Sequence, residues 1–472
     1  MEYEITIGLE THIMQKTKTK MFCGCLNLYN ALPNTNVCFV CLGYPGALPV
    51  INKKAVELCC KAGLLLGCTV NNFSKWDRKN YFYPDMAKNY QITQNDYPLC
   101  SNGFIEVEVQ GKIKKFYIER IHQEENAAKN SHEGKSSNVD YNRAGTALME
   151  IVSEPCMHST DEVLAYMTSI KQIMQYGGIS NCDQEKGQMR SDVNISVRPK
   201  GQKELGAKVE IKNMNSYSFI VDAINYESQR QINILSEGGF IDQQTRGYDS
   251  NRGQTFLQRT KEDAHDYRYF PEPDLLPINI TNQQIKKWSL ELPELPKDRQ
   301  NRYISLGLPE YDAKLLTNDI KISDWFDEVI KYTKNIKIAS NFVMGDIIRL
   351  TSDTSTEIFN SNLTSKIFAE IVDITHSKKI SVNSARQLIE IIFHNGGSPE
   401  EIIKEKEMIQ VSDNSLLISW IDEAIKNNPK PVQEYKDGNN SSINFIIGQV
   451  MKNSKGKANP STVMEILKNK LS

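Results

Sequence analysis

The sequence predicts an α+β protein: a mixed domain built on an antiparallel sheet, then an all-α middle domain and a small helical tail. Up to about residue 290, short segments alternate apolar and polar residues, as half-buried strands do, and helical patterns interrupt them. After PEPDLLP, helical periodicity and polar loops replace this alternation. The last stretch, which includes GQVMKNSKGKANP, is again helical but basic. We therefore predict domains at residues 1–292, 293–405 and 406–472.

Six segments of the first domain have the strand pattern. In YEITIGLETHI, the apolar side chains share one face of the strand, and Glu10 and His12 share the other. The Gln110-Gly111 pair between two alternating runs predicts a hairpin turn. The six segments are YEITIGLETHI, GFIEVEVQG, KIKKFYIERI, LMEIVSEP, RSDVNISVRP and AKVEIKNMN.

Three helices are predicted between these strands. NKKAVELCCKAGLLLG places Val56, Cys59 and Leu66 on one face. Ser159 begins a second helix with a capping hydroxyl followed by acidic residues. SFIVDAINYESQRQINILSEGG is the third, and its two final glycines are a helix stop signal.

Composition indicates an ordinary soluble protein with no overall bias toward nucleic acid. Lys+Arg number 56 and Asp+Glu number 58, so the net charge is −2 and any contact with a polyanion must come from a local basic patch. The stretch MEYEITIGLE lacks the features of a signal peptide, and the apolar runs are too short to span a bilayer. We expect a cytoplasmic protein, in which paired cysteines favour a metal over a disulfide.

Four of the ten cysteines lie in the stretch CGCLNLYNALPNTNVCFVC. Two short cysteine pairs separated by a loop are typical of a zinc site, and four thiolates fill a tetrahedral Zn²⁺ without leaving a position for catalysis. We therefore predict one structural Zn²⁺ that braces this loop. The alternative is that these residues are simply buried thiols. The predicted ligands are Cys23, Cys25, Cys38 and Cys41.

The polar faces of the predicted strands carry unusual residues. Asp192 and Asn194 alternate with apolar residues in RSDVNISV, and Glu210 and Lys212 do so in KVEIKN. A half-solvated sheet could explain this pattern. However, Asp, Asn and Glu are poor strand residues, and carboxylates on one sheet face would suit Mg²⁺ and a phosphorylated ligand.

Two further stretches concentrate residues that suit such a site. RIHQEENAAK places His122, Glu124 and Glu125 at a strand end, and RKNYFYPD combines Lys79 with aromatic residues. Basic residues beside aromatic ones can hold phosphate and stack on a base. The chain has no phosphate loop of the G-x-x-x-x-G-K-[ST] type, no kinase signature set and no G-x-S-x-G motif. The residues alone therefore indicate a polar sheet face that could bind a metal and phosphates.

Eight stretches carry a resemblance to a known family: IGLETHIMQKTKTKMFCGC, PNTNVCFVCLGYPGALPV, RKNYFYPD, ERIHQEENAAK, VDYNRAGTALMEIVSEP, MRSDVNISVRP, VEIKNMNS and AHDYRYFPEPDL. With the tail GQVMKNSKGKANP, they resemble the B subunit of the glutamyl/aspartyl-tRNA amidotransferase across essentially the whole chain. The resemblance implies a cradle-shaped first domain. There, ATP phosphorylates the side-chain carboxylate of glutamate on tRNA(Gln) or aspartate on tRNA(Asn), and ammonia then displaces the phosphate.

The resemblance also implies partners and site residues. An amidase (glutaminase) subunit would release ammonia from glutamine, and a small third subunit would join the two. His12, Glu125 and Glu150 match the family's Mg²⁺ ligands, with Glu10 beside them. Lys79 is the candidate phosphate contact. Asp192 would join the catalytic group, Glu210 and Lys212 would bind the nucleotide, and the tail would contact tRNA through Lys452, Lys455 and Lys457.

The chain departs from the family pattern after His12, where the glutamine falls one position later, at Gln15. On a strand, this shift would turn the side chain to the other face. Two other functions stay open at this point. One is a non-catalytic module that binds tRNA or a partner, with a purely structural polar face. The other is a stand-alone zinc protein that reads nucleic acid.

Overall fold

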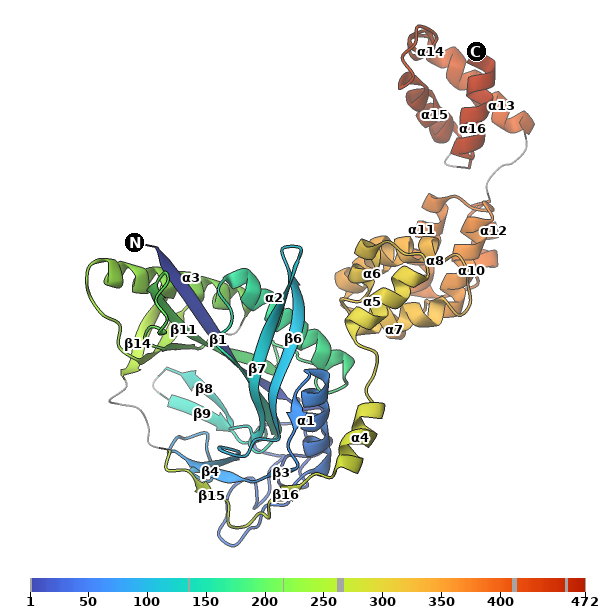
Figure 1. The fold of residues 1–472 in the computed structure, drawn as a ribbon. Coiled ribbons are helices and arrows are strands. Elements are labelled where there is room, and N and C mark those ends of the chain that lie inside the picture. The colour runs from blue at the N-terminus through green and yellow to red at the C-terminus, as the bar shows by residue number, and fades with distance from the viewer. Residues whose placement is uncertain are drawn as a thin grey trace. The chain divides into compact units, whose positions relative to one another are not determined.

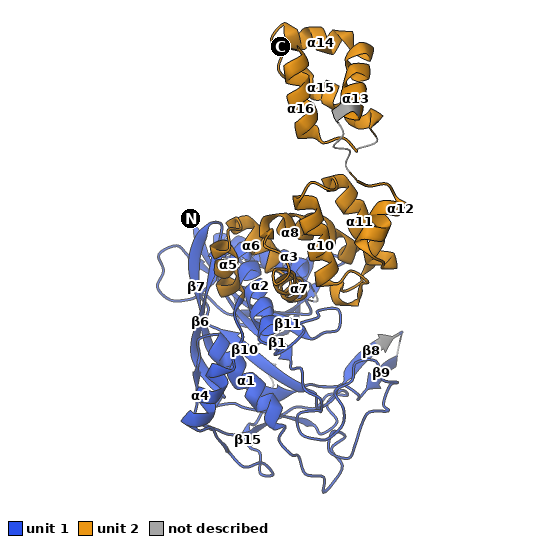
Figure 2. Cartoon of the chain, turned by 90° about the vertical axis from the view of Figure 1, so that its right-hand side faces the viewer, with its two compact units in different colours: residues 1–295 blue, residues 296–472 orange. Residues whose placement is uncertain are grey.

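The computed structural model describes residues 2–134, 136–214, 216–260, 267–409, 414–454 and 457–471. The chain forms two compact units, residues 1–295 and residues 296–472 (Figure 2). The first unit is a mixture of strands and helices, and the described part of the second is helical (Figure 1). A large sheet followed by many helices agrees with the predicted α+β class. The division into three domains stays a prediction.

The first unit contains the strands β1 (Tyr3–Met14), β2 (Thr69–Val70), β3 (Phe73–Ser74), β4 (Asp77–Asn80), β5 (Tyr90–Thr93), β6 (Cys100–Val109), β7 (Lys112–Glu125), β8 (Lys129–Glu133), β9 (Ser136–Asp140), β10 (Ala147–Ser153), β11 (Met189–Pro199), β12 (Val209–Lys212), β13 (Gln244–Asp249), β14 (Gln254–Thr260), β15 (Phe270–Pro271) and β16 (Ile278–Asn279). Its helices are α1 (Lys53–Leu65), α2 (Thr160–Tyr176), α3 (Tyr217–Ser236) and α4 (Asn282–Leu290).

The main sheet has nine strands in the order β14-β13-β12-β11-β1-β10-β7-β6-β2. All six predicted strand segments are present in it. The predicted hairpin is also confirmed, because Gln110 and Gly111 join β6 to β7 with φ values of 49° and 76°. Positive φ at both turn residues matches the right-handed twist of the two strands.

One pair of strands corrects the prediction of an antiparallel sheet. Among the described strands of the main sheet, neighbours run antiparallel except β12 and β13, which are parallel. A parallel pair needs a long crossover, and α3 provides it. The period-two pattern reveals a strand but not the direction of its neighbour, so the sequence pattern could not show this.

The apolar face of the sheet packs against α1, α2 and α3 in a single hydrophobic core. The predicted start of α2 and the predicted end of α3 are confirmed. The Ser159 hydroxyl accepts a hydrogen bond from the Glu162 backbone at the start of α2, and α3 ends before Gly238, which has a φ of 79°. Because the helices cover one face, the Glu10 and His12 side of β1 is left open for a site.

The second unit contains α5 (Pro296–Ser305), α6 (Glu310–Leu316), α7 (Ile320–Val329), α8 (Ile336–Phe342), a π-helical turn (Val343–Ile347), α9 (Ile348–Thr354), a 3₁₀ turn (Ile358–Asn360), α10 (Ser365–His376), α11 (Val382–Asn395), α12 (Pro399–Glu405), α13 (Asn414–Asn427), α14 (Pro429–Lys436), α15 (Ser442–Asn453) and α16 (Pro460–Leu471). Its buried apolar residues form two clusters, one from Tyr303 to Met408 and one from Leu417 to Leu471. Within the described residues, no helix combines the length and apolar character needed to cross a membrane.

Candidate active site

A row of ionisable residues crosses the polar face of the main sheet. His12 on β1 pairs with Glu150 on β10, which pairs with His122 on β7. On the other side of β1, His12 pairs with Arg190 of β11. Residues that pair across antiparallel strands point to the same face. The sheet register therefore brings together side chains that are far apart in the sequence.

Glu150 lies between two imidazoles. Its Oε2 is 3.3 Å from His12 Nε2 and 3.3 Å from His122 Nε2. Glu124 approaches from the next position on the same face of β7, with Oε1 3.5 Å from His12 Nε2. One ligand atom each from His12, Glu124 and Glu150 lie within 4.8 Å of one another. This spacing suits a single cation.

The two partners of Glu150 control its charge. Burial by itself would raise the pKa of Glu150, but His122 and His12 outweigh it and hold that pKa well below its usual range. Burial would conversely lower the pKa of His12, and the Glu150 carboxylate raises it instead. Glu150 is therefore ionised at neutral pH and is a good cation ligand.

Glu125, the predicted magnesium ligand, lies elsewhere. It pairs with Ala147, so its side chain points to the opposite face of the sheet from Glu124. Its carboxylate forms an ion pair with Lys88 and accepts a hydrogen bond from the Ile92 backbone at 3.0 Å. The structure places His12 and Glu150 together, as the sequence predicted, and it places Glu124 rather than Glu125 beside them.

A cavity of about 270 Å³ opens over this cluster and is strongly polar. Four of the lining residues are cationic: Lys79, Arg120, Lys212 and Arg259. Lys79 projects from β4, and its Nζ lies 4.6 Å from the ring centre of Tyr267. The full lining consists of Glu10, His12, Lys79, Thr93, Gln94, Asn95, Arg120, His122, Glu150, Asp192, Glu210, Lys212, Arg259, Tyr267 and Tyr269.

Lys212 is held between two carboxylates in this cavity. Its Nζ lies 2.7 Å from Asp192 Oδ2 and 2.8 Å from Glu210 Oε1. Burial would lower the pKa of Lys212, but the two carboxylates raise it, so the side chain is charged at neutral pH. Beside this group, Glu10 accepts a hydrogen bond of 2.8 Å from Asn194. The predicted residues Glu10, Asp192, Glu210 and Lys212 therefore share one site with Lys79.

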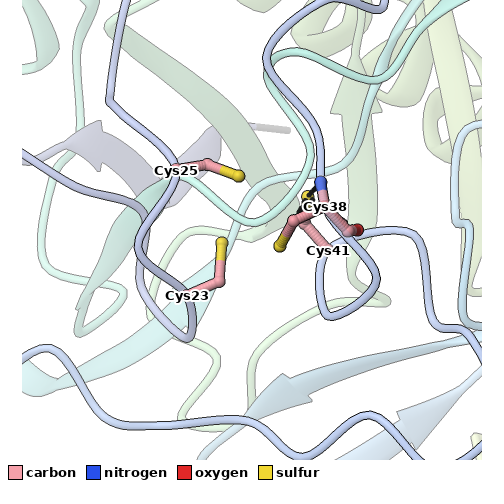
Figure 3. Close-up of side chains that lie close together, drawn as sticks. All are labelled: Cys23, Cys25, Cys38 and Cys41. Carbon is pink, nitrogen blue, oxygen red and sulfur yellow. Dashed lines mark hydrogen bonds between the residues drawn. The ribbon is translucent and has the colours of Figure 1, made fainter.

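The four cysteines of the short pairs converge in the structure. Their side chains point toward a common centre (Figure 3), and their sulfur atoms lie within 4.8 Å of one another. The pKa of Cys41 falls to about 4, because the Cys23 thiol hydrogen-bonds to it and Lys20 lies close by. Lys20 is fully buried, with Nζ 3.6 Å from Cys41 Sγ. The donor set and spacing fit a tetrahedral metal.

Comparison with known proteins gives a consistent result along the whole chain. The GatB/GatE catalytic domain family matches residues 5–286, and the GatB domain family matches residues 324–471. The aspartyl/glutamyl-tRNA(Asn/Gln) amidotransferase B subunit of Caldicellulosiruptor saccharolyticus is 48% identical, covering 100% of this chain and 99% of that protein. The chain belongs to this B-subunit family.

Two more B subunits of this amidotransferase show the same full-length similarity. The one from Thermoanaerobacter sp. is 48% identical and covers 100% of both chains. The one from Persephonella marina is 47% identical and covers 99% of both. Because the matches run from end to end, membership in the B-subunit family applies to the helical unit as well as to the sheet that carries the candidate site.

Several residues of this B-subunit site were not selected from the sequence. Arg120 is one of them, and strict alternation along RIHQEE would have found it, because it shares a face of β7 with His122. The sequence indicates Glu124 at this strand end, but the family pattern assigns the metal to Glu125. Arg259 reaches the site from β14, where its Nε donates to Thr245 at 3.1 Å. No local signal places Tyr267 and Tyr269 there, because β15 reaches β4 only through long-range pairing.

Gln15, the glutamine that is displaced by one position from the family pattern, has a structural role in this B-subunit chain. Gln15 is buried, its Nε2 donates to the Ala55 carbonyl at 2.9 Å, and its Oε1 accepts from Gln123 at 3.0 Å. It therefore connects the end of β1 to the start of α1 and to β7.

In the tail, Lys452 is exposed on α15, and Lys457 pairs with Glu407 at 2.8 Å. Lys455 lies outside the described residues.

Proposed function

We propose that this chain is the activating subunit of a tRNA-dependent amidotransferase. It phosphorylates the side-chain carboxylate of glutamate on tRNA(Gln), of aspartate on tRNA(Asn), or of both, using ATP. Ammonia then displaces the phosphate and leaves the amide. Support comes from relatives named for aspartyl- and glutamyl-tRNA that match over the full chain. The proposal places the reaction in the cytoplasm, with an amidase (glutaminase) subunit and a small third subunit as partners.

One observation carries this proposal: His12 and Glu150, which form a cluster with Glu124, line a cavity that four cationic side chains also line. A carboxylate is a poor acyl donor because its leaving group would be oxide, and phosphorylation provides a better one. Such transfer depends on positioning and on positive charge around the phosphate more than on a covalent step. The combination of a cation site with several cationic side chains suits that chemistry.

Magnesium fits the residues of this cluster. Two carboxylates supply the oxygen ligands that Mg²⁺ prefers, and the imidazole of His12 supplies a third donor. The donor atom of His12 that lies beside the two carboxylates is Nε2, which is 3.5 Å from Glu124 Oε1 and 3.3 Å from Glu150 Oε2. Three protein ligands leave positions for water and phosphate oxygens. When bound, the ion would draw charge from the phosphate oxygens.

The surrounding side chains have distinct parts in the proposal. Lys79 contacts the transferred phosphate from β4, in the cavity that His12 and Glu150 also line. Lys212 binds the nucleotide phosphates, and Asp192 and Glu210 hold its ammonium in place. Glu10 lies beside His12 on the same strand face and helps to position the acceptor carboxylate. These groups stay fixed because each belongs to a paired strand of the sheet or of the small β4 sheet.

The remaining predicted sites support substrate binding and stability. The tail lysines Lys452, Lys455 and Lys457 would contact phosphates or sugars of the tRNA and position it without reading bases. A Zn²⁺ held by Cys23, Cys25, Cys38 and Cys41 would brace the loop that follows β1. Neither site takes part in the chemistry. For the zinc site, this agrees with its four cysteine ligands, which leave no coordination position open to a substrate.

The test is amidation by the reconstituted enzyme. The chain is combined with its partner subunits, Mg-ATP, glutamine and either Glu-tRNA(Gln) or Asp-tRNA(Asn). Formation of the amidated tRNA together with ADP supports the proposal, and the pair of substrates shows which tRNA is used. If the chain binds tRNA and partners but produces no ADP with either substrate, it is a non-catalytic module and the proposal is wrong.

A further inference from the structure

The small sheet that carries Lys79 has two different faces. β4 pairs with β5 on one side and with β15 on the other (Figure 1). Phe270 of β15 is the direct partner of Arg78, so these two side chains share one face of the sheet. Their chain neighbours Lys79 and Tyr269 both line the cavity of the candidate active site. The face with Arg78 therefore lies behind the face that meets the cavity.

Arg78 is held on its face by a carboxylate and two aromatic rings. Its Nε donates to Glu272 Oε2 at 2.7 Å, and its Nη2 donates to Glu272 Oε1 at 2.8 Å. The Glu272 side chain is fully buried. The guanidinium carbon lies 4.1 Å from the ring centre of Tyr90 and 5.6 Å from that of Phe270. Paired bonds of this kind are strong and directional. We call Arg78 and Glu272 the clamp.

The clamp joins the segment 267–272 to β4, where the strand pairing is short. β15 consists of only two residues. One backbone hydrogen bond lies on either side of it: the Asn80 N–H donates to the Tyr267 carbonyl at 2.9 Å, and the Glu272 N–H donates to the Trp76 carbonyl at 2.8 Å. So short a strand has little stability of its own. The side-chain contact of the clamp therefore adds substantially to the attachment of the segment.

The attached segment places two tyrosines beside Lys79. The Lys79 Nζ lies 4.6 Å from the ring centre of Tyr267, and the ring centres of Tyr267 and Tyr269 are 5.9 Å apart. A lysine ammonium sits on a flexible side chain, so its neighbours set its direction. A shift of the segment would move both rings and leave Lys79 free to turn away from the cavity.

We propose that Arg78 is a positioning residue of the activation site: through Glu272 it holds the two tyrosines in place, and they direct the Lys79 ammonium toward the nucleotide phosphate. This inference rests on the proposed function. Arg78 itself does not line the cavity. A clamp that only stabilised the fold would change the melting temperature but not the affinity for nucleotide, because affinity is a property of the folded molecules.

The test compares two arginines in equivalent surroundings. Arg78→Lys keeps the charge but loses the planar fork that makes two bonds. Arg230→Lys is the matched control, because Arg230 on α3 contacts the fully buried Glu227 in the same way, through Nε at 2.9 Å and Nη2 at 2.6 Å. Each full-length variant is assembled with the partner subunits. The Kd for Mg-ATP is measured by calorimetry, backbone hydrogen exchange is measured in residues 267–275, and the melting temperature is recorded.

Both variants should have a lower melting temperature, but only Arg78→Lys should speed exchange in residues 267–275 and raise the Kd for Mg-ATP, by about tenfold. Arg230→Lys should stay within about twofold of wild type in Kd. In a Lys79→Met chain, adding Arg78→Lys should change the Kd by less than about twofold, because Arg78 acts through Lys79. A wild-type Kd in Arg78→Lys would overturn the proposal. So would equal changes in Kd for the two arginine variants, or an undiminished effect in the Lys79→Met chain.

A second variant covers a failure of Arg78→Lys to fold. Arg78→Met combined with Glu272→Gln removes the clamp without leaving a buried charge unpaired, and it should show the same change in Kd and exchange. Unchanged exchange in residues 267–275 of this double variant would show that the clamp does not hold the segment. A wild-type enzyme that does not bind Mg-ATP would instead count against the proposed function.

Discussion

His12 and Glu150 are direct partners across two antiparallel strands, and His12 Nε2 lies 3.3 Å from Glu150 Oε2. His122 flanks the same carboxylate from the next strand at an equal distance. Three strands that are distant in sequence thus supply one small cluster, and a slip of one residue in any of them would turn its contribution to the other face.

The two adjacent glutamates of β7 should have different roles. Glu124→Gln should lower amidation by about 100-fold and raise the magnesium concentration needed, because it removes a charged ligand. Glu125→Gln should leave the magnesium dependence unchanged and lower the free energy of unfolding by roughly 1–3 kcal/mol, because Lys88 loses its buried partner. Magnesium titrations of activity and thermal unfolding of both variants check this. The reverse result would restore Glu125 as the ligand.

The cysteine cluster should contain zinc. Protein purified without chelator should hold about one zinc ion per chain, measured by elemental analysis. Cys38→Ser should lose the ion and lower the melting temperature, because the loop loses its brace. Cys156→Ser is the control, since Cys156 is half-buried and lies outside the cluster. Absence of zinc from the wild-type protein would contradict the assignment.

Lys212 should serve both stability and nucleotide binding, and the two can be separated. Lys212→Met leaves Asp192 and Glu210 close together without their shared cation, so the protein should become less stable and inactive. Adding Asp192→Asn to that variant removes the repulsion and should restore the melting temperature but not ATP binding. If the double variant also binds ATP normally, Lys212 is only structural.

Asp346 in the π-helical turn should destabilise the helical unit at neutral pH. Burial raises the pKa of its carboxyl, and its Oδ2 accepts no hydrogen bond from the described residues. The folded chain therefore holds this proton more tightly than the unfolded chain, and stability is lost as pH rises through the unfolded and then the folded pKa. Asp346→Asn should stabilise the protein by about 1 kcal/mol or less at pH 7.

This gain should shrink toward pH 3.8, the ordinary pKa of aspartate, where Asp346 becomes protonated in both states. Thermal unfolding across this pH range provides the measurement. Asp353→Asn is the control, because Asp353 is exposed and forms only a surface ion pair with Arg349. A pH-independent difference between wild type and Asp346→Asn would show that the carboxyl charge is not the cause.

The tail lysines should act on tRNA binding alone. Exchanging Lys452 and Lys457 for glutamate should raise the KM for aminoacyl-tRNA by about tenfold and flatten its salt dependence, with little change in kcat. Lys366→Glu, an exposed lysine of α10, should have no such effect. Equal effects of both changes would indicate a general electrostatic contribution rather than a tail site.

Much of the secondary structure could be predicted because its signals are local. The alternation in YEITIGLETHI and the capping serine at Ser159 depend only on neighbouring residues, and the structure confirms both elements. The parallel pairing of β12 with β13 could not be predicted in this way. It depends on where the chain returns after α3, which is decided by packing against the rest of the sheet.

The residues of the candidate site also fall into those that the sequence could indicate and those that only the fold reveals. Glu10, His12, Lys79, Glu150 and Lys212 could be selected from residue type and family pattern, and the structure brings them to one cavity. The family pattern favoured Glu125, whereas alternation along β7 puts Glu124 on the face of His122. Arg259 and the two cavity tyrosines had no local signal. The hairpin that carries Arg259 joins the sheet through the pairing of β13 with β12 across α3, and the tyrosines precede β15, which pairs with the distant β4.

The sequence by itself determined which segments are strands and helices, the spacing of the four cysteines, and the family. The tertiary structure alone decided which carboxylate meets His12, and that Lys212 lies between Asp192 and Glu210. The physical reason is the distance along the chain over which each kind of interaction acts. Periodicity, capping and spacing act between near neighbours, whereas the hydrogen-bond register of the sheet sets which distant residues face each other.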